Sequence, residues 1–154
     1  MQRSCRILVA TDFSPGGNLG VQEAFSLCAG KGCRIVLAHV IEIAPPPNPL
    51  YAHYGVFQVP DAESLEQMKR EAARALEALV PPGARAEGIT IRIEVRAGHP
   101  VETLLDLATQ VAAEVLVVGD SGRGTLSRAL LGSVAARLVH HAPCSVLVAR
   151  AKQG

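Results

Sequence analysis

Five short runs of apolar and largely β-branched residues recur along the chain, and segments with helical spacing separate them. The runs lie at residues 6–11, 33–40, 89–95, 115–118 and 145–149. Such runs are typical of strands buried in a parallel sheet, where each crossover uses a helix. We therefore predict an α/β fold: a single doubly wound, five-stranded parallel sheet with helices on both faces. The run at 89–95 alternates apolar and charged residues, which predicts a strand with one solvated face at an edge of the sheet.

The first and last helices carry clear sequence signals. Ser14 followed by Pro15 predicts a helix start, because a serine hydroxyl caps the first turn and proline suits its first position. Near the end of the chain, the helical spacing of Val134, Leu138 and Val139 predicts the apolar face of the last helix.

One long irregular segment interrupts the alternation of strands and helices. Residues 44–60 contain five prolines, which can continue neither a strand nor a helix. We expect a loop over the carboxyl end of the second strand, which is a lid, a contact for a partner or simply a mobile segment.

Length and composition fit one globular domain over residues 1–154. Hydrophobic residues make up 49% of the chain and charged residues 19%, a balance typical of a folded chain. The formal net charge of +1 argues against a nucleic-acid-binding face. No apolar run is long enough to cross a membrane. The first residues, MQRSCRILVA, leave no room for a signal peptide, so we expect a cytoplasmic protein.

The cysteines lack the C-x-x-C spacing of redox and zinc motifs. Each lies within or beside an apolar stretch, as small buried side chains do. We interpret them as free thiols in a reducing compartment. They are Cys5, Cys28, Cys33 and Cys144.

A glycine-rich segment follows the fourth apolar run. Gly119 ends that run, Gly122 follows, and Gly132 with Ser133 precedes the last helical pattern. Strand, glycine loop and helix start together are typical of an anion-binding turn, because glycine lets backbone N–H groups approach a phosphate. Neither the P-loop pattern nor the three-glycine dinucleotide fingerprint is present. The residues alone leave a second interpretation open, in which these glycines only end a strand, form a turn and cap a helix.

The spacing Gly119-x2-Gly122-x9-Gly132-Ser133 resembles the nucleotide-binding signature of the universal stress protein family, in its ATP-binding branch. The segments ILVATDFSP and IVLAHVIE are similar to the first two strands of that family, so the resemblance covers nearly the whole chain. It implies the strand order 3-2-1-4-5. The first and fourth strands are then neighbours, with a crevice between Asp12 and Gly119 at their carboxyl ends.

The resemblance also implies which residues surround an adenine nucleotide. Asp12 carries a carboxylate suited to ribose hydroxyls or a base amine, although it can equally end a strand and cap a helix. Val40 would offer its backbone to the adenine edge. Gly119 and Gly122 would pass under the phosphates. The complete set of expected binding positions is Ala10, Thr11, Asp12, Val40, Val118, Gly119, Gly122, Arg123, Gly132, Ser133, Val134 and Ala135.

The chain departs from the family pattern between the first two glycines. Asp120 and Ser121 stand where the family has serine or threonine followed by histidine or arginine. A carboxylate near phosphates is unfavourable unless it faces away or holds a divalent ion. Arg123 could offset the negative charge. The departure bears on nucleotide affinity and on the use of Mg²⁺ or Mn²⁺ more than on the fold.

The sequence shows no catalytic constellation and no metal-ligand motif. It has no Walker-type lysine, no placed general base and no nucleophile with a partner. The first hypothesis is therefore an ATP-binding regulatory protein with little intrinsic hydrolysis, acting as a switch in a stress response with an unidentified protein partner. The second is a slow metal-dependent ATPase in which Asp120 helps hold Mg²⁺ or Mn²⁺. The third is a nucleotide-free interaction module.

The apolar run at 145–149 would leave an exposed sheet edge near the end of the chain. Pairing with its copy across a two-fold axis would cover that edge. The resemblance implies such a homodimer.

Overall fold

The computed structural model describes residues 5–43, 59–120 and 131–152. The strands within these ranges are β1 (Arg6–Ala10), β2 (Arg34–Glu42), β3 (Thr90–Gly98), β4 (Val115–Gly119) and β5 (Ser145–Ala149). The helices are α1 (Pro15–Cys28), α2 (Ala62–Ala78), α3 (Pro100–Gln110) and α4 (Ser133–His141). The loop expected at 44–60 lies almost entirely outside the described residues. Among the described helices, none has the length and apolar character needed to cross a bilayer.

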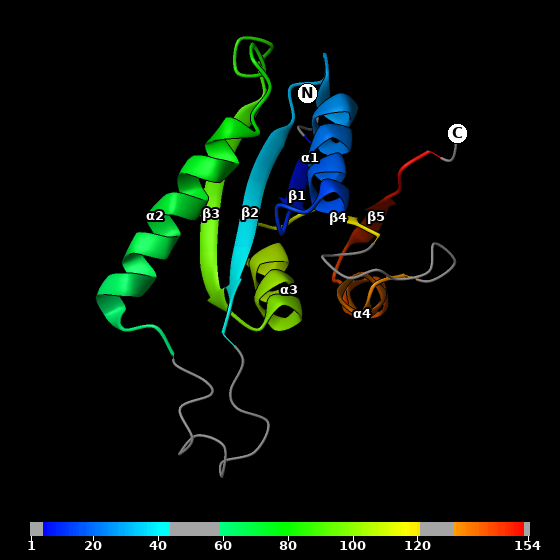
Figure 1. Ribbon diagram of the computed structural model, residues 1–154. Coiled ribbons are helices and arrows are strands. Elements are labelled where there is room, and N and C mark those ends of the chain that lie inside the picture. Colours follow the sequence, from blue (N-terminus) through cyan, green and yellow to red (C-terminus); the bar gives the residue numbers. More distant parts are fainter. Residues whose placement is uncertain (1–4, 44–58, 121–130, 153–154) are drawn as a thin grey trace.

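The five strands form one parallel sheet in the order β3-β2-β1-β4-β5, which confirms the predicted fold class and order. Strand side chains alternate between two cores. Ile7 and Val9 of β1 pack with α1 and α2 on one face. Leu8 and Ala10 pack with α3 and α4 on the other. Figure 1 shows these helices flanking the sheet on both sides.

The start of α1 is as predicted. Ser14 is the N-cap, and its Oγ accepts a hydrogen bond of 3.1 Å from the Gly17 N–H. Pro15 occupies the first turn, where its missing N–H costs no helical hydrogen bond. The placement of β3 at an edge of the sheet is also confirmed.

Strand lengths differ from the sequence-based expectation. The first strand ends at Ala10, one residue early, while β2 and β3 continue to Glu42 and Gly98. These two strands extend each other, because their ladder continues through Val40 paired with Arg96 and Glu42 paired with Gly98. The sequence did not predict this, since pairing with a neighbouring strand, rather than local alternation, holds the extra residues extended.

The predicted apolar face of the last helix is wrong in part. Leu138 is fully buried, but Val134 and Val139 are 39% and 47% exposed. Ala135 shares the buried face with Leu138 instead. The helix has only nine residues and packs one narrow stripe against the sheet, so the valines flank that stripe.

The cysteines match the expectation in two of four positions. Cys28 and Cys33 are buried, whereas Cys5 and Cys144 are half-buried, and all four are free thiols. Burial raises the pKa of Cys28, with help from a hydrogen bond to Cys33. Burial likewise raises the pKa of Cys5 and of Cys144. The thiolate, which is the reactive form, is therefore disfavoured at these three positions.

The end of β4 and the first turn of α1 approach each other backbone to backbone. A Cβ on Gly119 would lie 2.6 Å from both the carbonyl carbon and the oxygen of Gly16. A Cβ on Gly20, one turn along the helix, would lie 3.3 Å from the carbonyl carbon of Val118. Glycine at 119 is therefore required by the packing of the fold.

We predict that Gly119→Ala lowers the free energy of unfolding by about 2 kcal/mol, because the added methyl group meets backbone atoms that cannot rotate away. Urea denaturation measures the change. Gly20→Ala is the matched control. Its added methyl group is less crowded than the one at position 119, and alanine stabilises a helix by roughly 0.5–1 kcal/mol relative to glycine, so this variant should lose less stability than Gly119→Ala. Equal stability of the two variants would contradict the packing argument.

Candidate functional site

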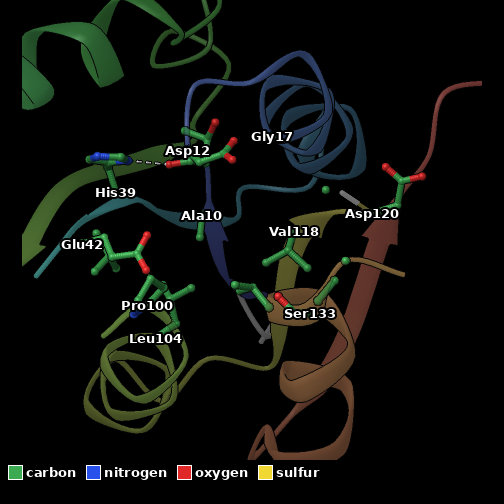
Figure 2. A pocket seen from close by; sticks show the side chains of 16 residues that line it. Ala10, Asp12, Gly17, His39, Glu42, Pro100, Leu104, Val118, Asp120 and Ser133 are labelled. Atoms are coloured by element: carbon green, nitrogen blue, oxygen red, sulfur yellow. Dashed lines mark hydrogen bonds between the residues drawn. The ribbon is translucent and has the colours of Figure 1, made fainter. Parts of the chain in front are cut away.

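A pocket of about 440 Å³ opens at the carboxyl ends of the central strands. The strand order places β1 between β2 and β4, at the point where the connections leave for opposite faces of the sheet. Ligands of open α/β sheets bind at such a switch point. Figure 2 shows the lining side chains converging there from β1, β2, β4 and the starts of the surrounding helices.

Most residues expected at the binding site line this pocket together. The expected positions that line it are Ala10, Thr11, Asp12, Val40, Val118, Gly119, Gly132, Ser133, Val134 and Ala135. The remaining two, Gly122 and Arg123, lie outside the described residues. Six further lining residues were not among the expected binding positions: Gly17, His39, Glu42, Pro100, Leu104 and Asp120.

The turn between β1 and α1 holds Asp12 in place. Its Oδ1 accepts a 3.0 Å hydrogen bond from the Ser14 N–H and a second from the Ser14 hydroxyl. Phe13 has a φ of 64°, a left-handed conformation unusual for a bulky residue. Asp12 therefore follows the end of β1 and holds Ser14, which is the residue that caps α1, and Asp12 also lines the pocket.

The Thr11 hydroxyl already makes two hydrogen bonds within the protein. Its hydroxyl donates to Asn18 Oδ1 at 2.9 Å and accepts from the Phe13 N–H at 3.0 Å. The residue is buried, and its own N–H donates to the carbonyl of Ala38. Thr11 therefore shapes the turn, and its hydroxyl is already engaged on both sides.

Gly17 brings the first turn of α1 against the Asp12 side chain. A Cβ at this position would lie 2.7 Å from both Asp12 Oδ1 and Thr11 Oγ1. The sequence reasoning missed Gly17, although a signal existed. Two consecutive glycines in the first turn of a helix lower its stability, so a close approach can explain them.

His39 braces the same turn from β2. Its Nδ1 lies 2.8 Å from the carbonyl oxygen of Thr11, and since a carbonyl only accepts, Nδ1 carries the proton. The imidazole also packs on the Phe13 ring, with centroids 4.6 Å apart. A polar residue inside an otherwise apolar strand was the available signal for this role.

The backbone of Val40 points toward the space beyond β1. Arg34 donates its N–H to the carbonyl of Cys5, and the Ala38 carbonyl accepts from the Thr11 N–H, so even-numbered residues of β2 bond toward β1. The ladder between these strands ends at Ala10 paired with Ala38. By the same alternation, the N–H and C=O of Val40 face the pocket edge, where no further β1 residue pairs with it.

The opposite side of the pocket is the start of α4. Gly132 is the N-cap and has no side chain, so among the described residues no side chain caps the first N–H groups of the helix. Uncapped N–H groups and the helix dipole favour an anion at this end. Gly132 also donates its N–H to the Asp120 carbonyl at 2.6 Å, and Asp120 donates its N–H to the Ala149 carbonyl at 3.1 Å. The two ends of the glycine segment are thus held together beside β5.

The Asp120 carboxylate faces away from the centre of the pocket. Its Oδ2 lies 3.7 Å from Nε of Arg150, just beyond β5. Figure 2 shows the side chain directed away from Ser133 and Val118. Of the two arrangements that the sequence left open, the structure has the first, with the carboxylate turned outward. Among the described residues, no cluster of three histidine, cysteine or acidic side chains is arranged to hold a metal ion.

The model of the universal stress protein family matches residues 5–150 of this chain. Universal stress protein Sll1388 from Synechocystis is 28% identical over 148 residues, covering 93% of this chain and 96% of that protein. Universal stress protein MJ0531 from Methanocaldococcus jannaschii is 25% identical over 145 residues, covering 94% and 81%.

Solved structures share the fold over nearly the full length. The protein MJ0577 superimposes with a TM-score of 0.76 at 21% identity, covering 97% of this chain and 98% of that one. A universal stress protein in complex with cAMP gives a TM-score of 0.67 at 25% identity, with coverages of 96% and 98%. One from Archaeoglobus fulgidus in complex with dAMP gives 0.60 at 18% identity, with coverages of 97% and 100%. The family match over residues 5–150, together with the observed sheet order, shows that this chain belongs to the universal stress protein family.

Proposed function

We propose that this chain is an ATP-binding universal stress protein of the cytoplasm, a nucleotide-dependent regulatory switch with little intrinsic hydrolysis and an unidentified protein partner. One observation carries the proposal. The pocket at the switch point is lined by the ten described positions at which the family resemblance expects an adenine nucleotide. The relative in complex with cAMP supports the adenine part of the ligand.

In the proposed complex, the nucleotide crosses the carboxyl ends of β1 and β4. The phosphates lie at the start of α4, near Ser133, where the helix dipole favours negative charge. The base lies toward β2, with its edge at the Val40 backbone and its face on apolar side chains such as Ala10 and Val118. Asp12 is placed to accept hydrogen bonds from ribose hydroxyls.

The negative charge of the lining residues indicates that ATP would bind together with a divalent cation. The described lining residues include Asp12, Glu42 and Asp120 but no lysine or arginine. Mg²⁺ commonly binds through substrate phosphates and one or two carboxylates, without a cage of protein ligands. Asp120 would have to turn from Arg150 toward the phosphates to meet that requirement for Mg²⁺ or Mn²⁺. Arg123, in the glycine segment, would supply further positive charge.

The pocket offers little for hydrolysis. Asp12 is engaged by Ser14, and among the described lining residues no lysine stands ready to stabilise phosphoryl transfer. The second hypothesis, a slow ATPase, would require the Asp120 carboxylate to leave Arg150 and turn toward the phosphates.

ATP binding is tested by isothermal titration calorimetry and by thermal unfolding with ATP and Mg²⁺. We expect the wild type to bind and its melting temperature to rise. Gly17→Ala should weaken binding about tenfold, or ~1.4 kcal/mol, because the new Cβ displaces the Asp12 carboxylate. Gly20→Ala, the same change one turn further along α1, should leave binding unchanged. Absence of ATP binding by the wild type would overturn the proposal in favour of the nucleotide-free module.

Hydrolysis is tested by single-turnover release of phosphate from bound [γ-³²P]ATP. We expect the nucleotide to stay largely intact while it remains bound, because Asp12 is engaged by Ser14 and the described lining residues include no lysine or arginine. Steady turnover that requires Mg²⁺ or Mn²⁺ and falls in Asp120→Asn would establish the slow ATPase instead.

The proposed homodimer pairs β5 with its copy. Ala149 uses its carbonyl toward the β4 side, so by alternation Val146 and Val148 bond outward, at the open edge of the sheet. Val146→Pro removes one outward N–H and should convert the dimer to a monomer in light scattering at micromolar concentration, because proline is tolerated at edges. Circular dichroism checks that the fold is kept. A monomeric wild type would refute the dimer.

A further inference from the structure

The pocket has a second acidic side chain at its β2 end. Glu42 is the last residue of β2 and pairs with Gly98 of β3. It is two residues beyond Val40, so its side chain leaves the same face of the sheet, the face covered by α3 and α4. The Glu42 side chain therefore lies on the same side of the pocket as Val40, beyond the point where β1 ends.

Figure 2 shows the Glu42 side chain beside Pro100 and Leu104, across the pocket from Ser133. Leu104 lies on the buried face of α3, within the core. Glu42 itself is exposed at the rim, where a ligand can reach its carboxylate. This end of the pocket therefore combines apolar side chains with one accessible hydrogen-bond acceptor.

Within the described part of the chain, no hydrogen bond or ion pair engages the Glu42 carboxylate. This contrasts with Asp12, held by Ser14, and with Asp120, which faces Arg150. A glutamate without an ion-pair partner at the rim of a pocket keeps both oxygens available to a ligand. An ionised carboxylate only accepts hydrogen bonds, so it favours a group that donates them.

The order of groups along the pocket decides which part of a nucleotide meets Glu42. Phosphates belong at the start of α4, near Ser133, and the base then lies at the opposite, β2 end. There the Val40 backbone presents one donor and one acceptor, while Glu42 adds a second acceptor. Adenine carries an exocyclic amine that donates hydrogen bonds, whereas unsubstituted purine carries only hydrogen at that position.

We propose that Glu42 determines base specificity by accepting a hydrogen bond from the exocyclic amine of the adenine ring. This inference rests on the proposed nucleotide binding and adds a residue that selects the base. Asp12 and the start of α4 contact the sugar and the phosphates, which all nucleotides share. Glu42 discriminates among bases.

The test is a cycle that removes the carboxylate and the amine separately and together. The ligands are ATP and purine riboside 5′-triphosphate, which is ATP without its amine, both with Mg²⁺. The proteins are the wild type and Glu42→Ala, with Glu66→Gln as a control that removes one negative charge on the exposed surface of α2. Calorimetry gives the four dissociation constants and those of the control.

We expect the wild type and Glu66→Gln to bind ATP about tenfold more tightly than the deaminated ligand, as one charge-assisted hydrogen bond allows. In Glu42→Ala the preference for ATP should fall to the part that the Val40 carbonyl alone supplies, with ATP weakened and purine riboside triphosphate unchanged or slightly improved. If Glu42→Ala keeps the wild-type preference for ATP, or weakens both ligands equally, Glu42 does not contact the amine. If the wild type binds neither ligand, the proposed function itself fails, which is a different result.

Discussion

The backbone contact between Gly119 and the first turn of α1 sets the geometry of the whole site. The end of β4 lies so close to Gly16 that a Cβ on Gly119 would lie 2.6 Å from its carbonyl atoms. This contact fixes where β4 ends relative to β1, and thereby the width of the pocket between Asp12 and Ser133. A glycine that the sequence motif associates with phosphates is thus also required by the packing of the protein.

Hydrogen bonds between neighbouring residues hold the turn after β1. Asp12 caps the turn through Ser14, Thr11 is bonded to Asn18 and Phe13, and His39 holds the Thr11 carbonyl from the neighbouring strand. These hydrogen bonds stabilise the left-handed conformation at Phe13, which is costly for a bulky residue. These hydrogen bonds form this side of the pocket without a ligand, and such preorganisation would lower the entropic cost of the proposed binding.

The two ends of the pocket differ in their electrostatics, and in the proposed complex this difference would orient the nucleotide. The start of α4 is an uncapped helix N-terminus, favourable for negative charge. The β2 end has Glu42 over an apolar wall, favourable for a hydrogen-bond donor. Asp120 would oppose a phosphate if it faced inward, but its pairing with Arg150 turns the charge toward β5. Through its N–H and this ion pair, Asp120 also links the glycine segment to the edge strand of the sheet.

Local patterns in the sequence determined the number of strands, the fold class, the start of α1 and the edge position of β3, because burial periodicity and capping are encoded within a few residues. The family resemblance added the strand order and the ten described positions that line the pocket. Only the tertiary structure decided the rest. The ladder between β2 and β3 extended both strands, the short α4 exposed Val134 and Val139, and the contact with Arg150 oriented Asp120. Gly17 enters the pocket from α1, whereas His39 and Glu42 enter it from β2. Their proximity depends on which elements become neighbours, a long-range property that no local pattern carries.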